Sequence, residues 1–199
     1  EPRGHADMYG AILTEPTTED GDFGILFMHN EGYSSMCGHG ILAAVTIAME
    51  CGQINPADDE TLAIRIDSPA GRITAYACWR DGRPDVSFDC VASFVEVTDL
   101  AVNLDGLGRV CCDIAFGGAY YAYVDADELG LDCTPKNTAA LIDAGRAIKQ
   151  AVAESYALTH PLHADLSFLY GTIFTSRLGL KPGSHSRHVC IFADGEVDR

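Results

Sequence analysis

The sequence predicts an α+β chain of mostly antiparallel strands and two helices of unlike character. Short apolar stretches recur between turn-forming Gly, Pro, Asn and Asp residues, which is the pattern of strands. Residues 41–49 form a run that would be apolar on every face of a helix, whereas residues 137–156 place apolar side chains along one stripe only. With 199 residues, 47% hydrophobic and 21% charged, the composition is ordinary for a globular protein.

The first half of the chain is expected to hold one helix among strands. Residues 10–14 and 23–29 read as strands, because their apolar residues alternate or run together on either side of the turn-rich segment 15–21. A helix is expected over residues 38–50, with Gly52 as a C-terminal cap. Three further strands are expected at residues 61–67, 71–79 and 85–97.

The second half repeats this mixture with a different helix. Two strands, 109–115 and 119–124, flank the pair Gly117-Gly118. The amphipathic helix over residues 137–156 is expected to lie on the surface of a sheet. Strands at residues 166–174 and 188–193 complete the pattern.

The charge balance excludes several classes of partner. The net charge is −16, from 13 Lys and Arg against 29 Asp and Glu. Nucleic acids and anionic membrane surfaces require a basic surface, so neither is an expected partner. No apolar run approaches the roughly 20 residues of a membrane span. A small anionic substrate would have to be held by local N–H groups.

The cysteine pattern argues against a metal site. The eight cysteines lie at positions 37, 51, 78, 90, 111, 112, 133 and 190. No spacing is Cys-x-x-Cys, and none lies near a His at zinc-finger distance, so no metal is expected. A chain of this kind is not a short secreted scaffold, which favours reduced cysteines and a cytoplasmic location over disulfides.

Cys37 stands immediately before the apolar helix, in the run Met36-Cys37-Gly38-His39-Gly40. The free N–H groups of a helix N-terminus favour a thiolate and can also bind a carboxylate. A cysteine beside an apolar run is often only a small core residue. Three residues of low helix propensity at a helix start cost stability, however, and a purely structural start favours Ser, Thr or Asp. We therefore interpret Cys37 as a functional thiol.

The chemistry that this thiol suits best is proton abstraction. His39 lies two residues from Cys37 on a diverging face of the helix, which is poor geometry for a Cys–His nucleophilic couple. A thiolate can instead act as a base at the carbon next to a carboxylate. The substrate carboxylate would then bind the N–H groups of Gly38 and His39, and the helix dipole would stabilise the developing enolate.

These residues resemble the proline racemase family, whose first catalytic motif is a Met-Cys-Gly-His-Gly run opening a buried helix. Further runs match in consistent order along the whole chain. They are residues 1–11 (EPRGHADMYGA), 27–33 (FMHNEGY), 116–122 (FGGAYYA) and 189–199 (VCIFADGEVDR). Within the family, the residues of the first two runs, 1–11 and 27–33, look most like those of the trans-3-hydroxy-L-proline dehydratases. His5 and Asp7, in the first run, are expected to form a structural turn.

The resemblance implies the diaminopimelate-epimerase-like fold, in which two similar lobes of mostly antiparallel strands each wrap a central helix. The first lobe would comprise residues 1–95, with the buried helix that follows Cys37. The second would comprise residues 96–199. In the family, an Asp-Arg-Ser-Pro run leads into a second catalytic motif and a second central helix, so we expect this chain to be a fragment that ends before them.

The resemblance also implies the activity. The expected reaction is dehydration of trans-3-hydroxy-L-proline to 1-pyrroline-2-carboxylate, without a cofactor, through Cys37 as the base. Asp198 would contact the ring nitrogen of this small imino acid, beside Gly38 and His39. The nearest alternative is a 4-hydroxyproline 2-epimerase or proline racemase with a second Cys where the dehydratases have Thr. A further alternative is an inactive imino-acid-binding protein. A homodimer is an expected assembly.

Overall fold

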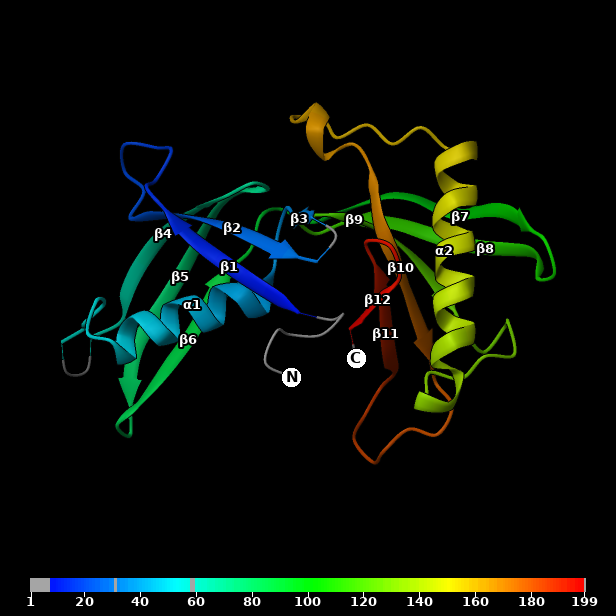
Figure 1. Cartoon of the computed structure of the whole chain (residues 1–199). Helices are drawn as coiled ribbons and strands as arrows, with labels where there is room; N and C mark the ends of the chain where they lie inside the picture. Colours follow the sequence, from blue (N-terminus) through cyan, green and yellow to red (C-terminus); the bar gives the residue numbers. More distant parts are fainter. Residues whose placement is uncertain (1–7, 31, 58–59, 199) are drawn as a thin grey trace. The chain divides into compact units, whose positions relative to one another are not determined.

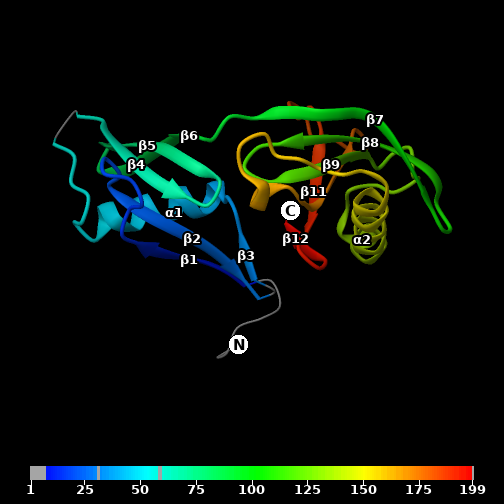
Figure 2. The same cartoon turned by 90° about the horizontal axis from the view of Figure 1, so that it is seen from above.

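A computed structural model describes residues 8–30, 32–57 and 60–198, and Figures 1 and 2 show it in two views. The chain divides into two compact units, Glu1–Ala92 and Ser93–Arg199. Each unit has its own sheet. In the part of the chain that is described, no helix is long and apolar enough to cross a membrane.

The first unit is a mixed sheet with one helix against it. Its strands run in the order β1-β2-β4-β5-β6, and β3 pairs with β2. Only β2 and β4 are parallel among these pairs. The elements are β1 (Tyr9–Thr14), β2 (Phe23–His29), β3 (Gly32–Ser34), α1 (Gly38–Glu50), β4 (Leu62–Ser68), β5 (Gly71–Arg80) and β6 (Arg83–Asp89).

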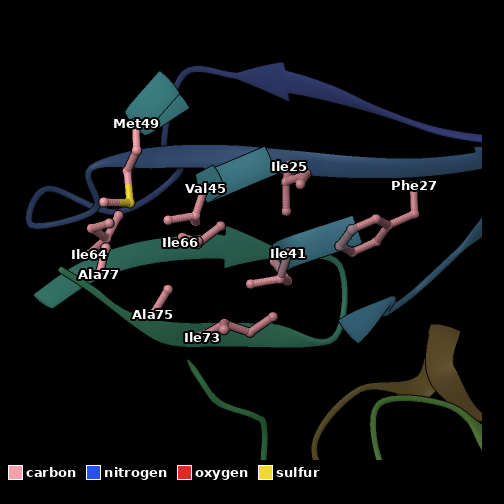
Figure 3. Packing of buried hydrophobic residues seen from close by; sticks show 10 residues of the cluster. All are labelled: Ile25, Phe27, Ile41, Val45, Met49, Ile64, Ile66, Ile73, Ala75 and Ala77. Atoms are coloured by element: carbon pink, nitrogen blue, oxygen red, sulfur yellow. The ribbon is translucent and has the colours of Figure 1, made fainter. Parts of the chain in front are cut away.

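The core of this unit lies between α1 and the sheet. Ile41, Val45 and Met49 project from successive turns of α1 and are buried. Figure 3 shows these side chains facing those of the strands beneath them. The strand residues of the cluster are Ile25, Phe27, Ile64, Ile66, Ile73, Ala75 and Ala77. Burial of such apolar area, at about 25 cal/mol per Å², holds the helix on the sheet.

The predicted bounds of this helix, 38–50, are confirmed. The prediction that all its sides are buried is wrong for the described residues, because a single sheet covers only one side. His39 and Ala43 are exposed, and Ile47 is 58% exposed. The apolar residues on the uncovered side line a cavity, which is described below.

The loop between β1 and β2 is fastened to the sheet by one carboxylate. Asp67, at the end of β4, is buried, and its Oδ2 accepts hydrogen bonds from the backbone N–H groups of Thr17 and Thr18 at 2.8 and 2.9 Å. Its Oδ1 accepts from Arg72 Nε at 2.8 Å, and Arg72 also bonds to Asp20. The sequence interpretation assigned no role to this network.

The second unit is a six-stranded sheet in the order β12-β11-β10-β9-β8-β7, in which only β9 and β10 are parallel. The amphipathic helix predicted over residues 137–156 is confirmed as α2 (Thr138–Ser155). It packs on β10, β7 and β11 (Figure 1). Its buried residues are Leu141, Ala144, Gly145, Ile148 and Val152. The strands are β7 (Phe94–Leu104), β8 (Gly108–Phe116), β9 (Tyr120–Asp125), β10 (Leu169–Ser176), β11 (Arg187–Phe192) and β12 (Glu196–Asp198). Short 3-10 turns, Pro135–Asn137 and Ala164–Leu166, precede α2 and β10.

One predicted strand is wrong. The segment 85–97 is two strands, because β6 ends at Asp89 and β7 begins at Phe94. The intervening residues pass from one compact unit to the other, since the division falls between Ala92 and Ser93. A run of apolar residues does not reveal that its two halves belong to different sheets.

Candidate active site

Cys37 is the N-cap residue of α1. Its backbone is extended, with φ −147° and ψ 109°, and its Sγ accepts a hydrogen bond from the Gly40 N–H at 3.3 Å. Its carbonyl accepts from the Ile41 N–H at 3.0 Å and begins the helical ladder. The sulfur thus takes the place that a Ser, Thr or Asp oxygen usually holds at a helix start. The geometry fixes the thiol at the positive end of the helix dipole.

The two N–H groups between these bonds, those of Gly38 and His39, donate to no acceptor within the described residues. Helix N-terminal N–H groups without an intrahelical acceptor form an anion-binding position. The structure therefore brings together Cys37, Gly38 and His39, three of the residues predicted for the site, at one helix end. His39 itself is exposed.

The glycines of the motif are required by packing beneath it. A Cβ added to Gly40 would lie 2.8 Å from Phe27 Cε1 and 3.4 Å from Cys37 Cβ. One added to Gly38 would lie 3.0 Å from Phe88 Cζ. Sequence reasoning linked these glycines to the approach of a ligand; the structure adds that aromatic rings from β2 and β6 occupy the space of their missing side chains.

The residues that precede Cys37 are held on two sides. Ser34 and Ser35 are buried. The carbonyl of Ser35 accepts a hydrogen bond from the Ala70 N–H at 3.1 Å, and Ser34 Oγ is hydrogen-bonded to the Tyr9 hydroxyl. The Tyr9 ring in turn stacks on His29, with centroids 6.2 Å apart. These contacts tie the turn that carries the thiol to β1, β2 and the β4–β5 connection.

A cavity of about 490 Å³ adjoins the thiol, on the side of α1 that the sheet leaves uncovered. It lies between β1 and α1, and Cys37 and His39 line it together. Most of its other residues are apolar or small: Tyr9, Gly10, Ala11, Leu13, Gly40, Ala43, Ala44, Ile47, Ala48 and Gln53. An apolar cavity with a few polar groups at one end is typical of a small-ligand site.

Comparisons with known proteins show the family of this chain. The family model described as proline racemase matches residues 1–199. The chain belongs to the proline racemase family. It is 51% identical to the "Trans-3-hydroxy-L-proline dehydratase" of Colwellia psychrerythraea and 45% identical to that of Homo sapiens, covering 100% of this chain and 56% and 57% of those proteins. The chain thus spans a little over half the length of these relatives.

The fold of the proline racemase family is confirmed by a solved structure. A hydroxyproline epimerase from Agrobacterium vitis, with bound trans-4-OH-L-proline, superimposes with a TM-score of 0.87 at 26% identity, over 100% of this chain and 57% of that one. The expected two lobes of mostly antiparallel strands, the first with the helix that follows Cys37, are therefore established.

Asp198, the fourth residue predicted for the site, lies in the second unit. It is exposed in the edge strand β12, where it pairs with Cys190 of β11. It therefore belongs to a different unit from the three residues at the start of α1. His5 and Asp7, which were expected to form a turn, lie outside the described residues.

The other cysteines occupy different environments. All eight are free thiols. Burial raises the pKa of Cys112 to about 11 and that of Cys190 to about 12, and it also raises the pKa of Cys90 and Cys133. Among the described residues, no group of three or more His, Cys, Asp and Glu side chains is placed to hold a metal ion.

Proposed function

We propose that the protein containing this chain dehydrates trans-3-hydroxy-L-proline to 1-pyrroline-2-carboxylate, with Cys37 as the base. The observation that carries the proposal is a thiol at a helix N-cap, beside two free N–H groups and an apolar cavity. The substrate class comes from relatives named as dehydratases of this amino acid at 45–51% identity over the full chain. The free cysteines support a reducing compartment, for which we propose the cytoplasm.

The proposed reaction needs only acid–base chemistry. The substrate carboxylate binds the N–H groups of Gly38 and His39, and the Cys37 thiolate removes the Cα proton. The resulting electron pair forms the Cα–Cβ double bond and expels the 3-hydroxyl. The departing hydroxyl takes the proton that Cys37 has just removed, so it leaves as water and the thiolate is restored. The enamine product then takes up a proton at Cβ and loses one at nitrogen to give the cyclic imine. Asp198 is proposed to contact the ring nitrogen.

The helix end explains why this position suits such a base. Negative charge increases at the substrate carboxylate as the Cα proton leaves, and the N–H groups lie where that charge develops. A preorganised donor of this kind accounts for about 10²–10³ in rate in enzymes where one has been removed. The side chains that line the cavity, Ala43, Ala44 and Ile47 among them, are apolar and offer no competing hydrogen-bond partner.

The likeness to a solved hydroxyproline epimerase favours a second candidate, inversion at Cα. Inversion requires a second acid on the opposite face, which is a Cys in the racemases and epimerases and a Thr in the dehydratases. One thiolate base suffices for elimination. The higher identity to the dehydratases, 51% against 26%, supports elimination as the first candidate.

The test supplies trans-3-hydroxy-L-proline, trans-4-hydroxy-L-proline and L-proline separately to the full-length protein. We expect trans-3-hydroxy-L-proline to lose water and the other two compounds to show no epimerisation. NMR spectroscopy monitors both reactions. Cys37→Ser should abolish this turnover. Cys51→Ser, at the exposed C-cap of the same helix, is the matched control and should retain it. Rapid inversion of trans-4-hydroxy-L-proline without dehydration would assign the epimerase activity, and ligand binding without turnover would assign an inactive binding protein.

A further inference from the structure

The hairpin that carries Asp198 lies beside α2 (Figures 1 and 2). Close approach is possible because α2 has no side chain at Gly145. A Cβ there would lie 2.8 Å from Ile191 Cβ, in the strand that leads into the hairpin. Thr172 Oγ1, which is buried in β10, donates to the Gly145 carbonyl at 3.1 Å and fastens the helix to the sheet at this level.

Two cations of α2 then bond to the backbone of the hairpin turn. Arg146 Nε donates to the Asp194 carbonyl at 2.7 Å, and its guanidinium donates to the same oxygen a second time. Lys149 Nζ donates to the Ala193 carbonyl at 2.6 Å. Residues 146 and 149 lie three apart, so they share one face of the helix. Both charges are thus directed to adjacent carbonyls of one turn.

The turn has an unusual backbone conformation at two of its residues. Ala193 has φ +49°, which is the left-handed region that residues with a side chain seldom occupy. Gly195 has φ +112°, and a Cβ added to it would lie 2.6 Å from Arg146 Nε. The ion pair between Arg146 and the Asp194 carboxylate is long, 3.8 Å, and that carboxylate is 81% exposed. Within the turn, the Gly195 N–H donates to the Phe192 carbonyl and the Asp194 N–H donates to Glu196 Oε2, both at 3.0 Å. The bonds from Arg146 and Lys149 are the ones that join this turn to α2.

Strand β12 is short and lies at the edge of the sheet. It has three residues, and its strand pairing within the described part of the chain is with β11, through Cys190↔Asp198, Ile191↔Val197 and Phe192↔Glu196. Because side chains alternate across a sheet, a slip of one residue would move Asp198 to the opposite face. Register in a hairpin is set by its turn.

We propose that Arg146 and Lys149 are positioning residues, which clamp the turn 193–195 so that β12 keeps its register and presents Asp198 to the substrate. This inference rests on the proposed function, in which Asp198 contacts the ring nitrogen. Lys149 is half-buried at this place, and burial lowers its pKa while Asp194 and Glu196 raise it. A cation that loses part of its hydration needs a hydrogen-bond partner in its place, and the Ala193 carbonyl supplies one.

The test measures ligand binding through protection of Cys37. Iodoacetamide alkylates Cys37 in the full-length protein while pyrrole-2-carboxylate, a planar carboxylate with a ring N–H, is titrated in. In the double variant Arg146→Leu with Lys149→Met, we expect the half-protecting concentration to rise about tenfold, the effect of losing one hydrogen bond to a charged group. The alkylation rate without ligand should not change, because Cys37 belongs to the other unit.

Two controls separate positioning from general destabilisation. Ile148→Val thins the core of the second unit without touching the turn, and Lys136→Met removes an exposed cation before α2. Both should keep the wild-type half-protecting concentration, and so should Arg146→Lys, which retains a donor. If the double variant does not fold, each single variant is measured in the same way.

Amide hydrogen exchange measures the restraint on β12 directly, whether or not the proposed function is correct. The amides of β12 should exchange faster in the double variant than in the wild type, while those of β10 should not. If pyrrole-2-carboxylate does not protect Cys37 of the wild type from alkylation, the proposed function is refuted. Hydrogen exchange in β12 would then test the clamp by itself. Unchanged exchange in β12, or unchanged half-protection in a protein that the ligand does protect, would overturn the inference.

Discussion

Replacing Gly40 by Ala should damage both the stability of the first unit and the chemistry of Cys37. The new Cβ would lie 2.8 and 3.0 Å from two carbons of the Phe27 ring and 3.4 Å from Cys37 Cβ. Phe27 is fully buried at 0% exposure, so its ring has no free space to move into. Overpacking of this kind costs about 1–3 kcal/mol. Alanine regains about 1 kcal/mol through its higher helix propensity.

The net expectation is a loss of about 0–2 kcal/mol in the free energy of unfolding. The Gly40 N–H also donates to Cys37 Sγ, so a shift at this residue moves the thiol. Gly38→Ala is the matched comparison, because its Cβ would meet only the edge of Phe88, a half-buried ring, at 3.0 Å. Urea denaturation and the alkylation rate of Cys37 measure the two effects. A Gly40→Ala protein more stable than the wild type, or less perturbed than Gly38→Ala, would refute this account of the motif.

Three further changes test other parts of the structure. Cys37→Ser should abolish turnover but leave the helix start stable, because a hydroxyl can accept the Gly40 N–H; Cys37→Ala, which removes that acceptor, should unfold at lower urea concentration. Burial alone would raise the pKa of Asp67, but hydrogen bonds from Thr18 and Arg72 outweigh it and hold this pKa well below its ordinary 3.8. The ionised Asp67 therefore stabilises the folded state above pH 3.8, and this stabilisation is lost as the pH falls below that value. Asp67→Asn should therefore cost about 2 kcal/mol at pH 7 and flatten the acid limb of the unfolding curve. The isolated 199-residue chain should be inactive and self-associate through the open side of α1, and Ile47→Glu should reduce the apparent mass in sedimentation if that side is responsible.

The elements that the sequence predicted well are those whose own period reveals them. The bounds of α1 were predicted at 38–50, and α2 was placed within one residue at each end, because an apolar stripe and a capping residue are local signals. Strands β3 and β12, three residues each, are too short to show a period. They form because neighbouring strands offer them hydrogen bonds, which is information from distant parts of the chain.

Burial was harder to predict than secondary structure. The composition of α1 says that its residues are apolar, but not how many of its sides a partner covers. Ile47 and Val45 are equally apolar, yet one faces the cavity beside β1 and the other faces the sheet. Only the topology, with a single sheet beneath the helix, distinguishes them.

The same limit separates the parts of the candidate site. Cys37, Gly38 and His39 are adjacent in the sequence, so recognising a helix start was enough to place them together. The clamp on the β11–β12 hairpin joins Lys149 to Ala193 across 44 residues of sequence. Its one local signal was a pair of cations three residues apart on a helix, which solvated helices also show. What identifies them as a clamp is the absence of a side chain at Gly145, since that brings the helix close enough for both cations to reach carbonyls rather than water. The residues that could be found from sequence are those that touch the substrate in the proposal, and the residues that hold them in place required the fold.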